Sequence, residues 1–340
     1  MPLVSLVKAD DDRVEDAVDR AIDLVNGFEN IKGKKTISIK PNLCTPKSAA
    51  SGATTDPRIV DALISKINSL TTCEINIVET DNSKATADKT FAHLGYDALP
   101  EKYDNVHLVN LSKDKKVRVQ IDGEFFSSIL VPESMIFSDY LISVAKLKTH
   151  VDYLYTGVLK NQYGLLMKPR AQYHGFMSKI LVDLNRFYKP DLAVIDGITG
   201  MEGFGPTDGT PKPVGVVIAS KDPVAADAVG AQVIGIKPSK IGYLKHAEKK
   251  RLGSYKNIKV VGCNVSEVTT PFAFIKSRHF YLGRISLALQ RYSTYTKNFA
   301  ELFHLTRSAL STTGFSAIER RLSYSGLLRL ARDTLFKQDQ

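Results

Sequence analysis

Lysines and a histidine directly follow a strand-like apolar run in the middle of the chain. Residues 140–145 have the composition of a strand covered on both faces, and Lys146, Lys148 and His150 come next. Alternation along an extended chain puts Lys146 and Lys148 on the same side. Ammonium groups there could hold a carboxylate or a phosphate, whereas a strand that has emerged into solvent would carry them for solubility alone.

Polar residues also follow the other predicted strands. They are Lys40 and Asn42 after the first strand, Glu79 and Asp81 after the second, Asp196 after a later one, and Lys160 and Asn161 after a further apolar run. Ligands of open α/β sheets bind outside the carboxyl ends of the strands. We therefore expect these side chains to converge at one edge of the sheet.

The expected cleft contains a set of substrate-binding residues. Lys146, Lys148 and Lys160 would hold a carboxylate or phosphate, and Asn161 would orient it. The other candidates for contact with the substrate are Lys40, Asn42, Thr55, Gly203 and Gly205.

Two histidines and two aspartates are the candidate catalytic residues. His150 or His174 would exchange protons with the substrate, and Asp196 and Asp227 would adjust the pKa values of these histidines. Asp227 is expected to be buried, because its neighbours on a helix over 223–234 are apolar. A buried carboxylate needs a partner, which could be a lysine, a metal, the substrate or a structural ion pair. No HxH, HxxxH or HExxH spacing supports a metal site, and none is predicted.

A glycine-rich segment at 197–209 follows Asp196. Backbone N–H groups in such turns can approach an anion, which makes Gly203 and Gly205 candidates for binding. The spacing is neither GxGxxG nor a P-loop, so it assigns no nucleotide. A long turn that needs positive φ values explains the same glycines equally well.

Alternating strands and helices predict an α/β fold with a layered, largely parallel sheet. The expected strands are 35–40, 74–79, 139–145, 191–196, 214–219 and 257–262, and the expected helices are 12–27, 57–69, one ending at Gly95, 174–187 and 223–234. Asp122-Gly123, between two strand-like runs in 106–130, predicts an antiparallel hairpin insertion.

Strand signals stop after Val265, which predicts an α/β domain over 1–265 and a basic, amphipathic helical tail over 266–340. Residues 271–340 hold 11 lysines and arginines against 4 acids, a net charge of +7 out of the chain's +10. Packing of the tail on the core or on a second copy in a homodimer is favoured over docking on a membrane surface. Nucleic acid is disfavoured because the arginines are spread out.

Composition indicates a cytoplasmic protein, with peripheral membrane association left open by the tail. The residues are 43% hydrophobic and 24% charged, as in a globular protein, and the first five lack the start of a signal peptide. No run approaches the ~18 apolar residues that span a bilayer. Cys44, Cys73 and Cys263 are far apart and form no CxxC pair, so the chain alone is not expected to ligate an iron–sulfur cluster.

Several of these segments resemble the domain of unknown function 362 family. The matching pieces are KPNL at 40–43, TTDP at 54–57, KLKTH at 146–150, TGVLKNQYG at 156–164, His174, DGITGMEGFGPTDG at 196–209 and ASKDPVAADAVGAQVIG at 219–235. The resemblance implies an α/β domain. Because family members often carry ferredoxin-type iron–sulfur modules, it also implies redox chemistry. This chain has too few cysteines for such a module, so electrons would have to come from a ferredoxin-like partner.

These observations predict an enzyme that acts on a small anionic substrate. The reaction would be reduction with partner-supplied electrons, or acid–base isomerisation or elimination. The alternative is a ligand-binding protein without catalysis, whose basic tail docks on a membrane surface or on RNA. Paired histidines and buried acids favour the enzyme, whereas the charge concentrated in the tail favours the alternative.

Overall fold

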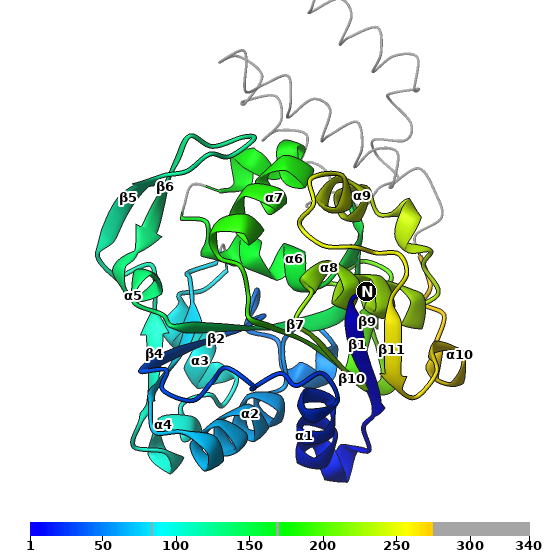
Figure 1. Ribbon diagram of the computed structural model, residues 1–340, viewed down its shortest axis with the longest axis horizontal. Helices are drawn as coiled ribbons and strands as arrows, with labels where there is room; N and C mark the ends of the chain where they lie inside the picture. The colour runs from blue at the N-terminus through cyan, green and yellow to red at the C-terminus, as the bar shows by residue number, and fades with distance from the viewer. Residues whose placement is uncertain (83, 168–169, 275–340) are drawn as a thin grey trace, which may run out of the picture. The chain divides into compact units, whose positions relative to one another are not determined.

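The computed structural model describes residues 1–82, 84–167 and 170–274, all within the unit Met1–Gly283. Its main sheet has the strand order β11-β1-β10-β9-β7-β2-β3-β4, with β8 paired to β7 (Figure 1). The strands are Leu3–Lys8 (β1), Thr36–Pro41 (β2), Glu74–Glu79 (β3), Val106–Asn110 (β4), Tyr140–His150 (β7), Leu154–Thr156 (β8), Leu192–Glu202 (β9), Thr210–Ser220 (β10) and Lys259–Gly262 (β11).

Most neighbouring strands of this sheet run parallel, which confirms the predicted fold class. β10 pairs antiparallel with β1 and β9, and β8 does so with β7, whereas the other pairs are parallel. The predicted antiparallel hairpin consists of β5 (Lys116–Gln120) and β6 (Ser128–Pro132), which form a separate two-stranded sheet. Residues 106–110 instead extend the main sheet as β4, next to β3.

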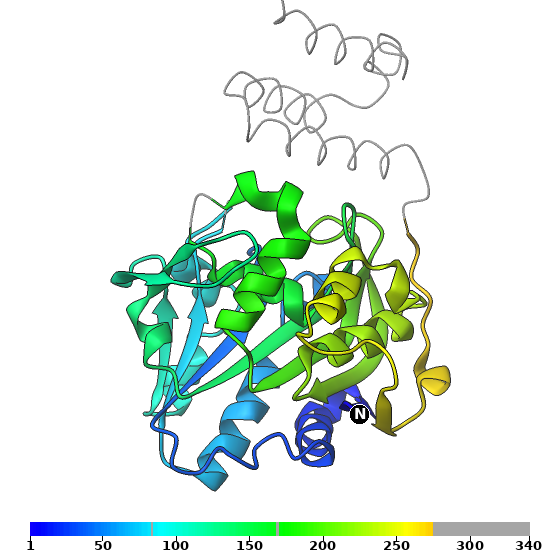
Figure 2. The ribbon, with the colours of Figure 1, turned by 45° about the horizontal axis from the view of Figure 1, so that its top comes forward.

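Helices cover both faces of the main sheet (Figures 1 and 2). One face carries α1 (Val14–Leu24), α2 (Pro57–Leu70), α3 (Ala87–His93) and α4 (Ala98–Lys102), and the other carries α6 (Val158–Asn161), α7 (Met177–Phe187), α8 (Pro223–Val233) and α9 (Gly242–Lys249). Each face has its own apolar core. The short helices α5 (Glu133–Ile136) and α10 (Val265–Val268) complete the set.

The starts of α2 and α8 follow from their sequences. Asp56 and Asp222 each precede a proline, and their carboxylates accept hydrogen bonds from the first backbone N–H groups of the helix. A carboxylate cap followed by proline is a favourable helix start. These two caps confirm the predicted helix boundaries.

The neighbouring strands β2 and β7 form a topological switch point. The chain leaves the carboxyl end of β2 toward α2 on one face, and it leaves β7 toward α6 and α7 on the other. In open α/β sheets such a point is the usual place for a ligand. All eleven residues of β7 are buried, so its lysines do not belong to a strand that has emerged into solvent.

The end of the described chain packs on the α/β domain. Phe272 is buried and its N–H donates to Ile234 O (3.1 Å), beyond the end of α8. The helices predicted for the tail fall in residues 275–340, outside the described residues.

Candidate functional site

Two buried ion pairs hold the carboxyl edge of the sheet together. Lys40 Nζ lies 2.9 Å from a Glu79 oxygen, and Lys146 Nζ lies 2.8 Å from Asp196 Oδ2. No side chain of these pairs is more than 6% exposed. Asp196 Oδ2 also accepts the N–H of Asp56 (2.8 Å), at the start of α2. Because each ammonium already has a carboxylate, Lys40 and Lys146 have little charge left for a ligand.

Lys148 is buried, and no carboxylate of the described residues bonds to it. Its ammonium donates to Asn42 Oδ1 (2.7 Å), Ala53 O (2.6 Å) and Cys44 Sγ (3.3 Å), which uses all three of its donors. Burial lowers the pKa of Lys148, and the neighbouring Cys44 opposes this effect. Two carbonyl oxygens and the sulfur of Cys44 therefore hold the ammonium of Lys148.

Asn161 connects the two loops of the switch point. Its Nδ2 donates to Lys40 O and to Ser143 Oγ (both 3.0 Å), and its Oδ1 accepts from Asn42 Nδ2 (3.2 Å). Thr55 Oγ1 in turn accepts the N–H of Asn42 (2.9 Å). Asn42, Thr55 and Asn161 thus meet as predicted, but their bonds go to one another and to the sheet.

Lys160 is the lysine of this site that no hydrogen bond or ion pair from the described residues holds. It is half-buried on α6, and among the described residues it has no hydrogen bond or ion pair. Its Nζ lies 5.5 Å from the centroid of the Tyr153 ring and 5.9 Å from that of Tyr163. Burial lowers the pKa of Lys160 to about 8; Lys148 acts in the same direction and Asp152 opposes it. An amine in this state can bind an anion or act as a base.

His150 lies in the same region and is neutral. Its Nδ1 accepts the N–H of Asp152 (3.1 Å), so its proton sits on Nε2. Burial lowers the pKa of His150 well below its ordinary value, and the charge of Lys160 acts in the same direction. The His174 ring packs edge-on against Tyr163, with 5.2 Å between the ring centroids. The His150 ring packs edge-on against Tyr153, with 5.1 Å between the ring centroids, so both histidines are close to the tyrosines beside Lys160.

The tautomer of His150 gives a first prediction. In ¹⁵N NMR spectra, the ring should show a proton on Nε2 and no titration between pH 5.5 and 8, because burial and nearby cations oppose its protonation. Comparison with His150→Gln assigns its signals among the seven histidines. A His150 signal that titrates with a midpoint near 6.5 would contradict the assignment.

Asp227 is fully buried, as predicted, but its partners are backbone groups. Its oxygens accept the N–H groups of Val158 (2.6 Å) and Leu159 (3.1 Å), the first residues of α6. A Cβ at Gly157 would lie 2.0 Å from Asp227 Oδ1, so only glycine fits there. The sequence suggested a lysine, metal, substrate or ion-pair partner. Instead, Asp227 positions the helix that carries Lys160.

A pH-dependent stability is expected from Asp227. Burial raises its pKa to about 7, although the N–H groups of Val158 and Leu159 oppose this. The unfolded chain releases this proton near pH 4, and the folded chain holds it until about pH 7. Stability should therefore fall by up to ~1.4 kcal/mol per pH unit across that window and level off above it. Asp227→Asn should remove this slope in urea unfolding curves.

Asp16→Asn, on the exposed face of α1, is the matched control and should leave the slope unchanged. If the free energy of unfolding changes with pH in the same way in the wild type and in Asp227→Asn from pH 4 to 8, Asp227 is ionised throughout that range.

Gly203 and Gly205 join the β9–β10 hairpin to the end of β7. Gly203 O accepts from Thr149 Oγ1 (3.1 Å), and Gly205 O accepts the N–H of Val151 (3.1 Å). The N–H of Gly203 donates to Ala273 O (2.9 Å), so this amide is occupied. Gly203 has φ +76°, as a turn requires. Much of the predicted loop over 197–209 is strand, because β9 continues to Glu202.

Residues that the sequence did not single out complete the site. Besides Cys44 and the two tyrosines, Arg170 donates to Thr80 Oγ1 (2.7 Å) and to three backbone oxygens. Cys44 could have been found from its place two residues after Asn42, whereas Arg170 carries no signal in the sequence. Among the described residues, no three histidines, cysteines or acids are placed to hold a metal.

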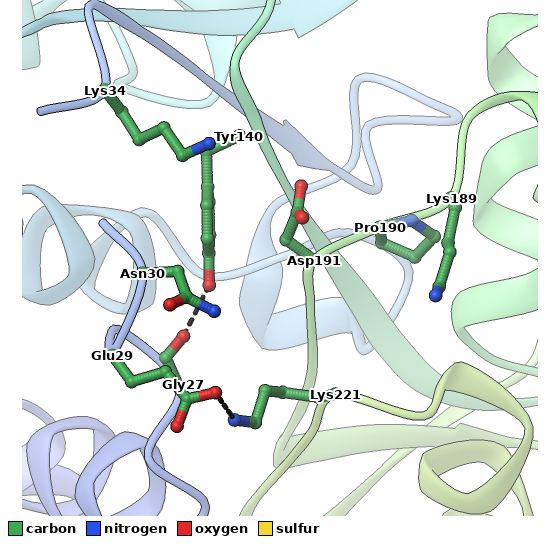
Figure 3. Close-up of a pocket in the computed structure, with 9 residues that line it drawn as sticks. All are labelled: Gly27, Glu29, Asn30, Lys34, Tyr140, Lys189, Pro190, Asp191 and Lys221. Carbon is green, nitrogen blue, oxygen red and sulfur yellow. Dashed lines mark hydrogen bonds and ion pairs between the residues drawn. The ribbon is translucent and has the colours of Figure 1, made fainter. Parts of the chain in front are cut away.

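A hollow of about 510 Å³ lies at the opposite, amino-terminal edge of the sheet (Figure 3). It is lined by Gly27, Glu29, Asn30, Lys34, Tyr140, Lys189, Pro190, Asp191 and Lys221. Its lining holds two acids, Glu29 and Asp191, against three lysines, and Glu29 pairs with one of them, Lys221 (2.5 Å). We do not place the functional site there, because the uncompensated buried charge lies at the carboxyl edge.

The fold and the site define an α/β protein with a lysine-rich, partly buried site at a switch point. The model of the family "Domain of unknown function (DUF362)" matches residues 37–232, and the chain belongs to this family. Thylakoid-associated protein sll1697 of Synechocystis sp. is 26% identical over 231 residues, which cover 66% of this chain and 70% of that protein.

Among solved structures, the lactate racemase apoprotein of Thermoanaerobacterium thermosaccharolyticum is similar, with a TM-score of 0.46 and 13% identity. The similarity covers 69% of this chain and 58% of the racemase chain, so this chain spans less than two thirds of it. In the part of the chain that the structure describes, no helix is long and apolar enough to cross a bilayer.

Proposed function

We propose that this protein is an enzyme that binds a small carboxylate or phosphate at the switch point between β2 and β7. The supporting observation is that the charge of Lys148 helps to lower the pKa of Lys160, yet within the described residues neither lysine bonds to a carboxylate. Holding such charges away from water is unfavourable. An anionic ligand would offset that cost, and Lys160 has donors to reach it.

The state of His150 favours acid–base chemistry over reduction. Its Nε2–H can donate to an oxygen of the substrate, while Lys160, with a pKa of about 8, can gain or lose a proton near neutral pH. Isomerisation or elimination of a small carboxylate needs a group that exchanges a proton and a donor that holds the substrate oxygen, and Lys160 and His150 would supply them in that order. The buried pairs of Lys40 and Lys146, and the cap by Asp227, would keep the site in position.

Thermal unfolding of the full chain tests this proposal. The ligands are inorganic phosphate, pyruvate, glyoxylate, oxalate and malate, and at least one should raise the Tm. A ligand at 100 times its Kd stabilises the folded state by about 2.7 kcal/mol. None should raise the Tm of Lys160→Met, whereas Lys34→Met, at the opposite edge, should respond like the wild type. No response to any ligand, or an equal response in Lys160→Met, would refute the proposal.

Docking of the basic tail on a membrane surface is a second candidate function. It is favoured by the name of the Synechocystis relative, which describes a thylakoid-associated protein, and by the net charge of +7 in residues 271–340. The full chain should then sediment with vesicles that contain anionic phospholipid and be released as salt is raised. Absence from the vesicle pellet at low salt would contradict it.

A further inference from the structure

The four lysines of the site differ in how their ammonium groups are used. Lys40 and Lys146 are held by carboxylates, and Lys148 donates to two carbonyl oxygens and to the sulfur of Cys44. Lys160 has none of these contacts among the described residues. Of these four lysines, Lys160 is therefore the one whose nitrogen can approach a ligand atom without giving up a hydrogen bond or ion pair to a described residue.

The surroundings of Lys160 favour the neutral amine. The charged or titratable groups that act on it are Lys148, Asp152, Cys44 and Arg170, and it in turn acts on His150. Among them, only Asp152 brings a carboxylate. With a pKa of about 8, roughly a tenth of Lys160 is neutral at pH 7, about 200-fold more than for a lysine with an ordinary pKa. A desolvated lysine beside another cation is a recognised way to activate an amine nucleophile.

We propose that Lys160 is a nucleophile that forms an imine with the carbonyl carbon of a small 2-oxo acid. This inference rests on the proposed function, because it identifies the anion bound at the switch point as a carboxylate with a carbonyl group next to it. The carboxylate of the substrate would be attracted by the charges of Lys148 and Arg170, which bond to no carboxylate among the described residues. Its carbonyl carbon would react with the neutral amine of Lys160.

The step balances without an oxidant or reductant. The lone pair of Lys160 Nζ attacks the carbonyl carbon, and the carbonyl oxygen takes up a proton to give a carbinolamine. The C–O bond then breaks as a C=N bond forms, and the oxygen leaves as water with both protons of the neutral amine. The neutral His150 can donate a hydrogen bond from Nε2–H to the departing oxygen without giving up its proton.

Reductive trapping on the full chain tests the imine. The protein is incubated with pyruvate or glyoxylate and sodium cyanoborohydride, which delivers hydride to the C=N carbon, and the peptides are mapped by tandem mass spectrometry. The reduced adduct should form on Lys160 at least ~10-fold faster than on other lysines at pH 7, because far more of its amine is neutral. The rate should rise with pH around 8.

Lys160→Arg keeps the positive charge but cannot form the imine, and it should give no adduct at this position. If pyruvate or glyoxylate raises the wild-type Tm without forming an adduct on Lys160, the imine is refuted and the anion site stands. If neither compound forms an adduct and no anion raises the Tm, both proposals fail. Equal labelling of Lys160 and of exposed lysines would also overturn the imine.

Discussion

Replacing Asp196 by asparagine should lower the free energy of unfolding by about 3–5 kcal/mol, which is the usual effect of leaving one member of a buried ion pair without its partner. Lys146 is 1% exposed and Asp196 is fully buried, so water cannot replace the lost carboxylate. The bond from the N–H of Asp56 would also weaken, because a neutral amide is a poorer acceptor. Chemical denaturation at pH 7 measures this loss.

The matched control is Asp10→Asn. Asp10 pairs with Arg13 at 2.6 Å, but both side chains are 69% exposed. Such surface pairs contribute about 0–1 kcal/mol, so this variant should unfold almost like the wild type. Similar losses in the two variants would show that the Lys146–Asp196 pair is not isolated from water.

Lys160→Met should weaken binding of the most stabilising anion by ~2–5 kcal/mol, about 30-fold to several thousand-fold. The reason is that the ligand would lose its direct charged contact while Lys148 remains bound to its own acceptors. Isothermal titration calorimetry measures the change. Stability should shift by no more than about 1 kcal/mol, because Lys160 makes no hydrogen bond or ion pair within the described residues.

Lys34→Met serves as the control for this variant, since Lys34 lines the hollow at the opposite edge. It should bind the anion with wild-type affinity. A large loss in Lys34→Met together with a small one in Lys160→Met would move the site to that edge.

The positions of the lysines could be predicted from the sequence, but their pairing could not. Alternation and the ends of apolar runs place Lys40 and Lys146 at the carboxyl edge. Which acid each one meets depends on the strand order, since β7 lies beside β9 and β2 lies beside β3. That order is set by packing between distant parts of the chain, and it brings Lys146 to Asp196 and Lys40 to Glu79.

Two other features could not be predicted from local sequence patterns, because they too depend on contacts between distant parts of the chain. The strand β1 was not predicted, because its partners β10 and β11 come from the other end of the described chain. Burial of Asp227 followed from its apolar neighbours on the helix. Its contact with the start of α6 did not, because residues 158 and 227 lie on two helices that meet only in the folded domain. That Lys160 has no hydrogen bond or ion pair among the described residues likewise depends on where the other polar groups of that part of the chain lie.

A crystal structure of the full chain with the most stabilising anion would show where the anion binds. We expect an oxygen of the anion within hydrogen-bonding distance, ~3 Å, of Lys160 Nζ, at the carboxyl edge between β2 and β7. An anion bound instead beside Lys34 and Lys189 in the hollow at the amino-terminal edge, with no ligand at Lys160, would contradict it.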